Sequence, residues 1–333
     1  MLKIQEKTLS VAPMMDWTDR HCRRLHRSLS GRALLYTEML TAQAVIHGDR
    51  GKLLGGDAAD GPVALQLGGA DPGQVAQAAR IGEGFGYAEI NLNVGCPSDR
   101  VQSGRFGACL MREPELVAAC MAEVMAAVSV PATVKCRLGV DDQDPEEGLF
   151  RLVELCAAAG VTTFVVHARK AWLRGLSPKQ NRDIPPLDYG LVYRLKAERP
   201  DLTVVINGGI GSLDEAEAHL ARVDGVMLGR AAYHEPGLLG AVDRRFFDPA
   251  APEVDGFEAV ERYRVHMARE LERGTGLHTL IRPMLGLFHG AQGARAWRRI
   301  LTVESTVKGA GLEVVDRALE ALRSAAERRL ELV

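Results

Sequence analysis

The sequence has no long hydrophobic run, and this absence excludes the simplest kind of membrane protein. A membrane-spanning helix needs about 20 consecutive apolar residues, and no stretch of the 333 residues approaches that length. The first residues, 1–13, also lack the hydrophobic region of a secretory signal. We therefore expect a cytoplasmic protein without a membrane partner, and no stable protein partner is evident.

Paired metal-ligand and nucleotide-binding motifs are also missing. The six cysteines form no Cys-x-x-Cys pair, so we expect neither a disulfide framework nor a zinc site, and no metal. No Gly-x-Gly-x-x-Gly motif follows the first strand-like run, which excludes a Rossmann nicotinamide domain. Any nicotinamide donor would then have to dock transiently.

What the sequence does contain is a regular alternation of strand-like and helix-like segments. Eight such strand-like runs lie at 8–13, 33–37, 62–68, 87–93, 131–137, 161–166, 202–206 and 224–228. This alternation predicts an α/β fold, the TIM (β/α)8 barrel. After Asp248 the strand signal disappears and only helical periodicity continues. We therefore expect a barrel domain over 1–247 and an all-helical C-terminal domain over 253–333.

Several strand-like runs end in a polar or reactive side chain. The residues at or near these ends are Gln66, Asn93, Lys135, His167 and Asn207. Independent core strands would not all finish in this way, whereas a (β/α)8 barrel gathers the carboxyl ends of its strands at one mouth. We therefore predict that these residues share one site.

Cys96 lies in a Gly-Cys-Pro turn directly after the fourth run. Taken alone, the thiol is equally well explained as a small buried core residue or as a reactive group held at a fixed angle by Pro97. The polar ends of the other runs favour the second interpretation.

The ligand of this mouth has several possible chemistries. Lys135 suits a Schiff-base nucleophile of an aldolase, a hydrogen-bond donor or half of a salt bridge. Amides such as Gln66 and Asn93 instead suit a planar heterocycle with donor and acceptor edges, such as a flavin or a pyrimidine. His167 fits a base, a phosphate contact or a flavin contact.

Two glycine-rich turns follow the last two strand-like runs. Main-chain N–H groups in such turns bind phosphate, and barrels place this site after strands seven and eight. The residues concerned are Asn207, Gly208, Gly209, Gly229 and Arg230. The turn Pro13-Met14-Met15 offers soft apolar surface to a flat ligand, or plain packing in the barrel floor.

Positive charge is concentrated in two segments of a chain that is close to neutral. The segment 167–186 is rich in arginine and lysine, with Trp172 and three prolines among them, and has a single aspartate. Between Arg262 and Arg299 there are eight arginines against two acids. Both segments predict an anionic partner. The glycine-rich segment 99–110 reads as a mobile loop over the mouth.

Long motifs of the chain closely resemble the tRNA-dihydrouridine synthases. They are VAPMMDWTDRHCR (11–23), LQLGG (65–69), INLNVGCPSDRVQSGRFGACLM (90–111), VKCRLG (134–139), INGGI (206–210) and LGRAAY (228–233). The segment VHARKAWLRGLSPKQNRDIPPL (166–187) is particularly similar to the corresponding sequences of the A-type subfamily. The resemblance spans nearly the whole chain.

The resemblance implies an FMN enzyme that reduces the C5=C6 bond of uridine in the tRNA D loop, at positions 20 and 20a, with electrons from NADPH. Cys96 would donate the proton to C5. Flavin contacts would come from Pro13, Met14, Met15, Gln66, Lys135, His167, Asn207, Gly208, Gly209, Gly229 and Arg230. Contacts to tRNA would come from Asn93, Lys179, Arg182, Arg295 and Arg298. The alternatives are a flavin oxidoreductase of free pyrimidines on the same barrel, and an RNA-binding module that has lost its chemistry.

Overall fold

The computed structural model describes residues 9–55, 61–98 and 104–330, which fall into two compact units. The first unit combines the segment up to Asp16 with Ala33–Gly229, and the second combines Trp17–Arg32 with the segment from Arg230 onward. The second unit thus includes a helix from near the N-terminus and begins earlier than the expected 253. The expected bounds of the two domains, 1–247 and 253–333, therefore stay a prediction.

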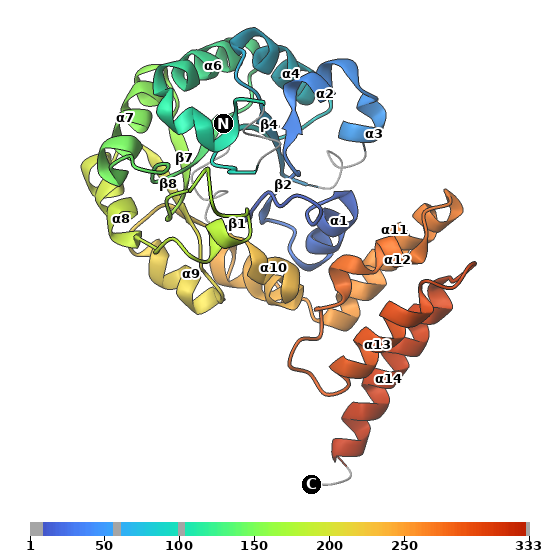
Figure 1. Cartoon of the computed structure of the whole chain (residues 1–333). Helices are drawn as coiled ribbons and strands as arrows, with labels where there is room; N and C mark the ends of the chain where they lie inside the picture. Colours follow the sequence, from blue (N-terminus) through green and yellow to red (C-terminus); the bar gives the residue numbers. More distant parts are fainter. Residues whose placement is uncertain (1–8, 56–60, 99–103, 331–333) are drawn as a thin grey trace. The chain divides into compact units, whose positions relative to one another are not determined.

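The first unit is the predicted (β/α)8 barrel, seen down its axis in Figure 1. Eight parallel strands close into a ring because β2 pairs with both β1 and β4. These strands are β1 (Leu9–Val11), β2 (Leu34–Tyr36), β4 (Val63–Gly68), β5 (Glu89–Val94), β6 (Ala132–Arg137), β7 (Thr163–His167), β8 (Thr203–Asn207) and β9 (Gly225–Leu228). All eight predicted runs are therefore confirmed as strands.

A ninth, two-residue strand was not expected from the sequence. β3 (Leu40–Thr41) pairs with the C-terminal part of β4, whereas β2 pairs with its N-terminal part. The chain thus leaves the sheet between Tyr36 and Leu40 and then rejoins it. At this break the hydroxyl of Thr37 accepts a hydrogen bond of 3.0 Å from the main-chain N–H of Gln66. The side chain thereby replaces a main-chain pairing.

Helices form the outer ring of the barrel unit (Figure 1). Side chains cap the first turns of several of them: Asp71 caps the helix that begins at Pro72, and Ser212 caps the one that begins at Leu213. The α-helices of this unit are α2 (Ala42–His47), α3 (Arg50–Leu54), α4 (Pro72–Gly84), α6 (Pro114–Ala127), α7 (Pro145–Ala158), α8 (Tyr189–Glu198) and α9 (Leu213–Leu220). The 3₁₀ helices are η3 (Gly107–Arg112) and η4 (Gln180–Arg182).

The interior of the barrel is a packed core rather than a pore. Because side chains alternate along a strand, every second residue points inward. One buried apolar cluster in this interior consists of Ala12, Leu34, Tyr36, Ala64, Val165, Val205 and Met227, with the half-buried Met14 packed against it. The apolar layer supports the polar residues at the strand ends.

The second unit is helical, as the sequence predicts for the tail. Its helices are α1 (Arg20–Leu29), α10 (Arg230–His234), α11 (Gly256–Glu272), α12 (Leu277–Leu280), α13 (Ala294–Glu304) and α14 (Leu312–Leu330), with η5 (Pro236–Ala241), the π-helix η6 (Asp243–Phe247) and η7 (Arg282–Met284). Helix α1 joins this unit through an ion pair of 2.6 Å between Arg20 and the buried Glu270. A second contact is the 2.9 Å hydrogen bond between the rings of His21 and His266.

Two further observations concern the described residues as a whole. None of their helices is both long and apolar enough to cross a bilayer. The segment 99–110 was expected to be a loop, and its residues 99–103 lie outside the described residues. From Gly107 onward the expectation was wrong, because the 3₁₀ helix η3 begins there.

Candidate active site

The strand ends of the barrel bring the five predicted polar residues to one mouth. Asn93 of β5 is in register with Lys135 of β6, and His167 of β7 is in register with Asn207 of β8. Gln66 lies two residues before the end of β4 and is buried. Since parallel strands share one direction, all five side chains lie toward the same end of the barrel interior.

Two amides form the polar edge beside the Cys96 turn. The amide nitrogen of Asn93 donates to the side-chain oxygen of Gln66 at 2.8 Å. The side-chain oxygen of Asn93 accepts from the main-chain N–H groups of Gly95, at 3.1 Å, and of Cys96, at 2.9 Å. Asn93 therefore fixes the turn that carries the thiol.

Cys96 is half-buried on this turn. Its thiol donates to the hydroxyl of Ser98 at 3.5 Å, and its carbonyl accepts from the N–H of Ala108 at 2.9 Å. Hydrogen bonds thus hold both sides of the turn, while the residue itself is not fully enclosed. This position agrees with a thiol held for chemistry better than with a fully buried core residue.

Lys135 contacts Asn207, which precedes the glycine turn, and interacts electrostatically with Cys96. Its ammonium group donates to the side-chain oxygen of Asn207 at 3.1 Å. Burial lowers the pKa of Lys135 to about 8, helped by the positive charge of Arg137 and opposed by Cys136 and Cys96. Because about 8 lies above neutral pH, the amine is mostly charged at pH 7.

His167 is held in its neutral form. Burial first, and then the charges of Arg137 and Lys135, lower the pKa of His167 well below its ordinary value. A Cβ at Gly208 would lie 2.5 Å from the ring of His167. The imidazole ring of His167 therefore packs so closely on residue 208 that only glycine fits there.

The turn after β8 has the backbone that its glycines predict. Gly208 has φ of 112° and Gly209 has φ of 75°, in the region that favours glycine. A Cβ at Gly229, after β9, would meet nothing within 4 Å. Arg230 follows Gly229 in sequence and begins α10 of the second unit. Both polar groups of the Asn207 side chain form hydrogen bonds within the chain. Its oxygen accepts from Lys135, and its amide nitrogen donates to the carbonyl of Met227 at 2.8 Å.

The turn after β1 supplies the apolar residues. Pro13 and Met14 are half-buried, and Met15 is 48% exposed. In the barrel unit, the only other large hydrophobic residues that are highly exposed among the described residues are Trp172 and Ile184, both in the segment after β7. Exposed apolar surface thus gathers on segments at the carboxyl ends of the strands.

Arg137 is a site residue that the sequence analysis missed. Its guanidinium donates to three main-chain carbonyls: Gly95 at 2.9 Å, and Lys170 and Asn181 at 3.0 Å each. It thereby joins the Cys96 turn to the segment after β7. The available signal was spacing, because Arg137 lies two residues after Lys135 and so on the same face of β6.

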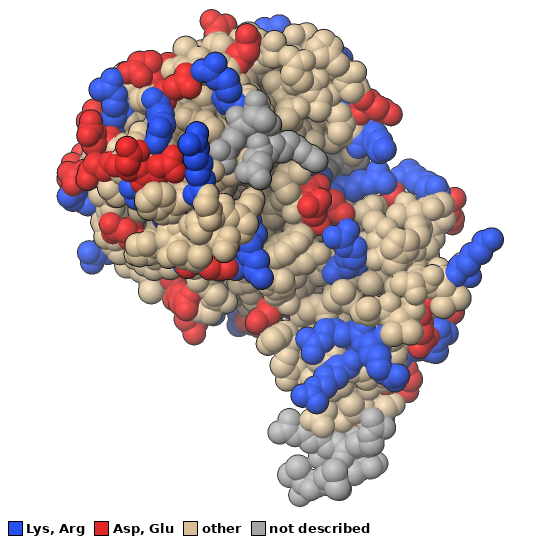
Figure 2. Space-filling view, in the orientation of Figure 1, with Lys and Arg blue, Asp and Glu red and all other residues tan. Residues whose placement is uncertain are grey.

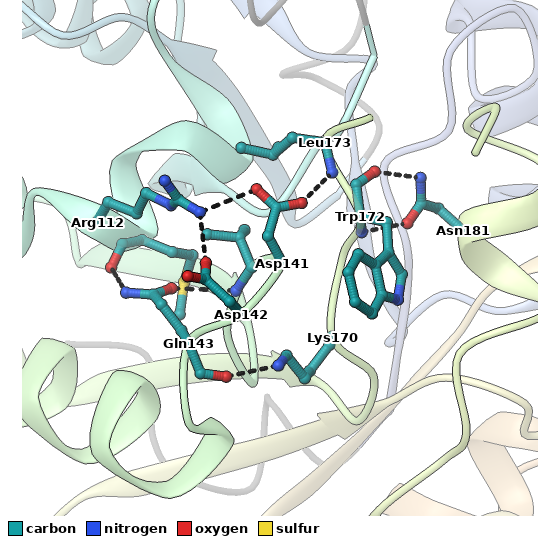
Figure 3. A network of polar contacts seen from close by, with 10 residues as sticks. Arg112, Asp141, Asp142, Gln143, Lys170, Trp172, Leu173 and Asn181 are labelled. Atoms are coloured by element: carbon teal, nitrogen blue, oxygen red, sulfur yellow. Dashed lines mark hydrogen bonds and ion pairs between the residues drawn. The ribbon is translucent and has the colours of Figure 1, made fainter. Parts of the chain in front are cut away.

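Hydrogen bonds from neighbouring residues hold the backbone of the basic segment 167–186. The buried side chain of Asn181 accepts from the N–H of Trp172 at 2.7 Å and donates to its carbonyl at 2.8 Å. Asp141 accepts from the N–H of Leu173 at 2.7 Å and from Arg112 at 3.1 Å, as Figure 3 shows. The indole of Trp172 is therefore carried on a backbone that is held from two sides.

The predicted cationic contacts lie in both units. Lys179 and Arg182 are exposed at η4 of the barrel unit. Arg295 and Arg298 are exposed on α13 of the second unit, together with Arg299. Figure 2 shows basic side chains gathered over α13. Each unit thus presents exposed positive charge of its own.

Comparison with known proteins identifies relatives over nearly the whole chain. The model of the dihydrouridine synthase family matches residues 10–326. A protein named tRNA-dihydrouridine(20/20a) synthase from Xanthomonas axonopodis pv. citri (strain 306) is 56% identical over 312 residues, which cover 94% of this chain and 93% of the relative. The protein of the same name from Escherichia coli (strain K12) is 54% identical over 312 residues, covering 93% and 90%.

A solved structure shares the architecture at low sequence identity. It is the old yellow enzyme homologue from Zymomonas mobilis, with a TM-score of 0.51 and 12% identity, covering 77% of this chain and 91% of that chain. At this identity the likeness concerns the fold alone, and it agrees with the barrel described above.

Proposed function

Because the chain belongs to the dihydrouridine synthase family, we propose that it reduces uridine to 5,6-dihydrouridine in the D loop of tRNA, at positions 20 and 20a. FMN is the bound cofactor and NADPH the transient electron donor in this proposal. The names of the relatives support the substrate and the positions. The observation that carries the proposal is the convergence of Cys96, two amides and Lys135 at one barrel mouth.

The residues of the mouth fit a flavin by their donor chemistry. Gln66, Lys135 and His167 offer polar groups to the edge of a heterocycle, and Met14 and Met15 offer apolar surface to its face. The phosphate belongs to the turns after β8 and β9. There Gly208 and Gly209 have no room for side chains, since a Cβ would approach within 2.5 Å of His167 or 2.6 Å of Leu187.

The reaction needs one hydride and one proton on opposite carbons of a double bond. FMN held by Gln66, Lys135 and His167 and reduced by NADPH would supply the hydride chemistry for C6 of uracil. Cys96 gives its proton to C5, which leaves a thiolate near the positive charges of Lys135 and Arg137. The tied turn holds the sulfur in position for this transfer, because Asn93 and Ala108 anchor it on both sides.

A uridine inside folded tRNA must leave its stack to reach the mouth. Asn93 reads the edge of the extruded base, and the exposed Lys179 and Arg182 contact the phosphates beside it. Arg295 and Arg298 on α13 add phosphate contacts from the second unit. Exposed arginines of this kind favour tRNA over a free pyrimidine as substrate, because a free base has no phosphate to bind.

The proposal is tested with the purified protein, NADPH and an unmodified tRNA transcript. Nucleoside mass spectrometry should detect dihydrouridine at positions 20 and 20a, and the protein should show a flavin absorbance band. Cys96→Ala should keep the flavin and its reduction by NADPH but lose at least about a hundredfold in dihydrouridine formation. Cys109→Ala, a second half-buried cysteine, is the control.

Three results would contradict the proposal. Reduction of free uracil at the same efficiency as tRNA would favour the oxidoreductase of free pyrimidines. A colourless protein that binds tRNA would favour an RNA-binding module. Full activity of Cys96→Ala would remove the thiol from the reaction.

A further inference from the structure

A continuous series of side-chain hydrogen bonds runs from the Cys96 turn into the closed interior of the barrel. It starts at the N–H of Cys96, which donates to the side-chain oxygen of Asn93, and the Asn93 nitrogen donates to Gln66. The Gln66 nitrogen donates to the side-chain oxygen of Asn91 at 2.8 Å. Each step so far joins a donor on the mouth side to an acceptor on the interior side.

The series continues in the same sense to a carboxylate. The nitrogen of Asn91 donates to the hydroxyl of Thr133 at 2.8 Å, and this hydroxyl donates to Glu89 at 2.5 Å. Tyr36 donates to the same oxygen of Glu89 at 2.7 Å. Apart from Asn93, which is 8% exposed, the side chains of this interior portion are at most 2% exposed. We call the residues Glu89, Thr133, Asn91, Gln66 and Asn93 the relay.

The mouth end of the relay fixes its direction. A main-chain N–H such as that of Cys96 can only donate, so the Asn93 oxygen accepts from it and the Asn93 nitrogen is turned toward Gln66. Along the rest of the relay, turning any one amide over would set nitrogen against nitrogen and oxygen against oxygen. The orientation of the amides is therefore determined by the whole series rather than by each local contact.

The direction matters because it decides what Asn93 can offer to a ligand. The side-chain oxygen of Asn93 has two lone pairs, and both are used by the N–H groups of Gly95 and Cys96. Of the two hydrogens on its nitrogen, one goes to Gln66, and the other has no acceptor among the residues that the structure describes. Toward a ligand, Asn93 is thus a donor and not an acceptor.

We infer that Thr133 and Glu89 are positioning residues, which act through the relay to hold Asn93 as a hydrogen-bond donor toward a carbonyl of the target base. This inference rests on the proposed function for the identity of the base. Uracil has carbonyl oxygens on both sides of its ring nitrogen N3, whereas cytosine carries an amino group at C4. A donor beside the thiol that serves C5 therefore suits uracil and repels the C4 edge of cytosine.

The test compares two substitutions that separate packing from hydrogen bonding. Thr133→Val keeps the shape of the side chain but leaves the Asn91 nitrogen without its acceptor. Thr133→Ser keeps the hydroxyl and loses the methyl group. Thr163→Val, at another buried threonine on neighbouring β7, controls for the general cost of such a change.

Three quantities should respond together in Thr133→Val. They are kcat/KM for tRNA, the affinity of the apoprotein for FMN, and the alkylation rate of Cys96 followed by peptide mass spectrometry. We expect kcat/KM to fall at least about tenfold, because a buried amide is left unsatisfied or turned over. Thr133→Ser should stay within about threefold of the wild type, and Thr163→Val should change the melting temperature only.

Equal losses in Thr133→Val and Thr133→Ser would assign the effect to packing and overturn the inference, as would a folded Thr133→Val that matches the wild type. A neutron structure of the wild-type protein tests the direction without any variant. It should locate one deuteron of the Asn93 nitrogen toward the side-chain oxygen of Gln66, and the reverse orientation would overturn the relay. Failure of the proposed function is distinct, because the wild type itself would then form no dihydrouridine.

Discussion

At the scale of single residues, burial rather than residue type decides the charge states of the mouth. Burial lowers the pKa of Lys135 to about 8 and that of Arg137 to about 10, and holds the pKa of His167 well below its ordinary value. Near neutral pH the mouth therefore combines two cations with a neutral imidazole. That combination suits stabilisation of negative charge next to a hydrogen-bonding ring.

The lowered pKa of Lys135 predicts a loss of activity in mild alkali. The ammonium form is present below pH 8 and disappears as pH rises through about 8. We expect kcat/KM to fall with a midpoint near that pH, measured in single turnovers of the prereduced enzyme. Lys135→Arg should shift this limb to higher pH, and an unmoved limb would exclude Lys135 as its source.

The same shift has the opposite consequence for stability. Since the pKa of Lys135 is about 8 in the folded chain and 10.5 for an unperturbed lysine, the unfolded chain binds this proton more tightly. The contribution of Lys135 to the free energy of unfolding therefore increases as pH rises from about 8 toward 10.5. Activity and the contribution of Lys135 to stability should thus change in opposite directions over this range.

At the scale of elements, the segment after β7 is the most specialised part of the barrel. Asn181 and Arg137 hold its backbone, and Trp172 is 43% exposed although its main chain is fixed. Lys170 lies 5.9 Å from the centre of the indole ring. An exposed aromatic ring on a rigid, basic segment is the surface on which an unstacked nucleobase can stack.

We therefore predict that Trp172→Ala raises KM for tRNA about tenfold, since stacking on one base contributes on the order of 1–3 kcal/mol. Flavin affinity and NADPH oxidation should not change. Trp172→Phe should recover most of the loss, and Ile184→Ala, at another exposed apolar residue of this segment, should have little effect. Equal effects of Trp172→Ala and Ile184→Ala would argue against stacking.

Helix α13 supplies a different kind of contact. The double variant Arg295→Ala and Arg298→Ala should weaken tRNA binding and reduce the slope of log K against log salt by about 2, because two phosphate contacts are lost. Flavin absorbance should stay unchanged. The control is Arg194→Ala with Arg199→Ala on and after α8, which removes the same charge from ion-paired positions of the barrel unit. Impaired flavin loading would indicate a structural role instead.

At the scale of the whole molecule, the two compact units do not follow the order of the chain. Helix α1, near the N-terminus, belongs to the helical unit, where Arg20 pairs with Glu270 and the carbonyl of Ser28 accepts from Arg262 at 3.2 Å. Its apolar residues Leu25 and Leu29 are at most 1% exposed. The barrel segment alone therefore contains a helix whose packing neighbours come from the tail.

This arrangement predicts that a chain ending at Phe247 is not an independent barrel. Without α11 it loses the neighbours of α1, so we expect a low soluble yield and a lower melting temperature than for the full chain. A chain ending at Ala310 lacks α14 but keeps α11, and it is the matched control. Cooperative melting of the shorter chain at the full-length temperature would show that residues 17–32 are held without the tail.

The sequence by itself determined the barrel and most of the residues at its mouth. Strand-like runs and helical periodicity are local signals, so they located the eight strands and the helical tail. The rule that strand ends meet at one mouth then grouped Gln66, Lys135 and His167. The role of Cys96 and the ligand came from the resemblance of long motifs, because a thiol on a turn does not specify its chemistry.

Only the tertiary structure decided which residues support that mouth. The break between β2 and β3, the carbonyl contacts of Arg137 and the relay from Asn93 to Glu89 depend on the register between strands. Register and long-range pairing join residues tens of positions apart, and no local pattern records them. The grouping of α1 with the tail has the same physical cause, since an amphipathic helix shows that it needs a neighbour but not which one.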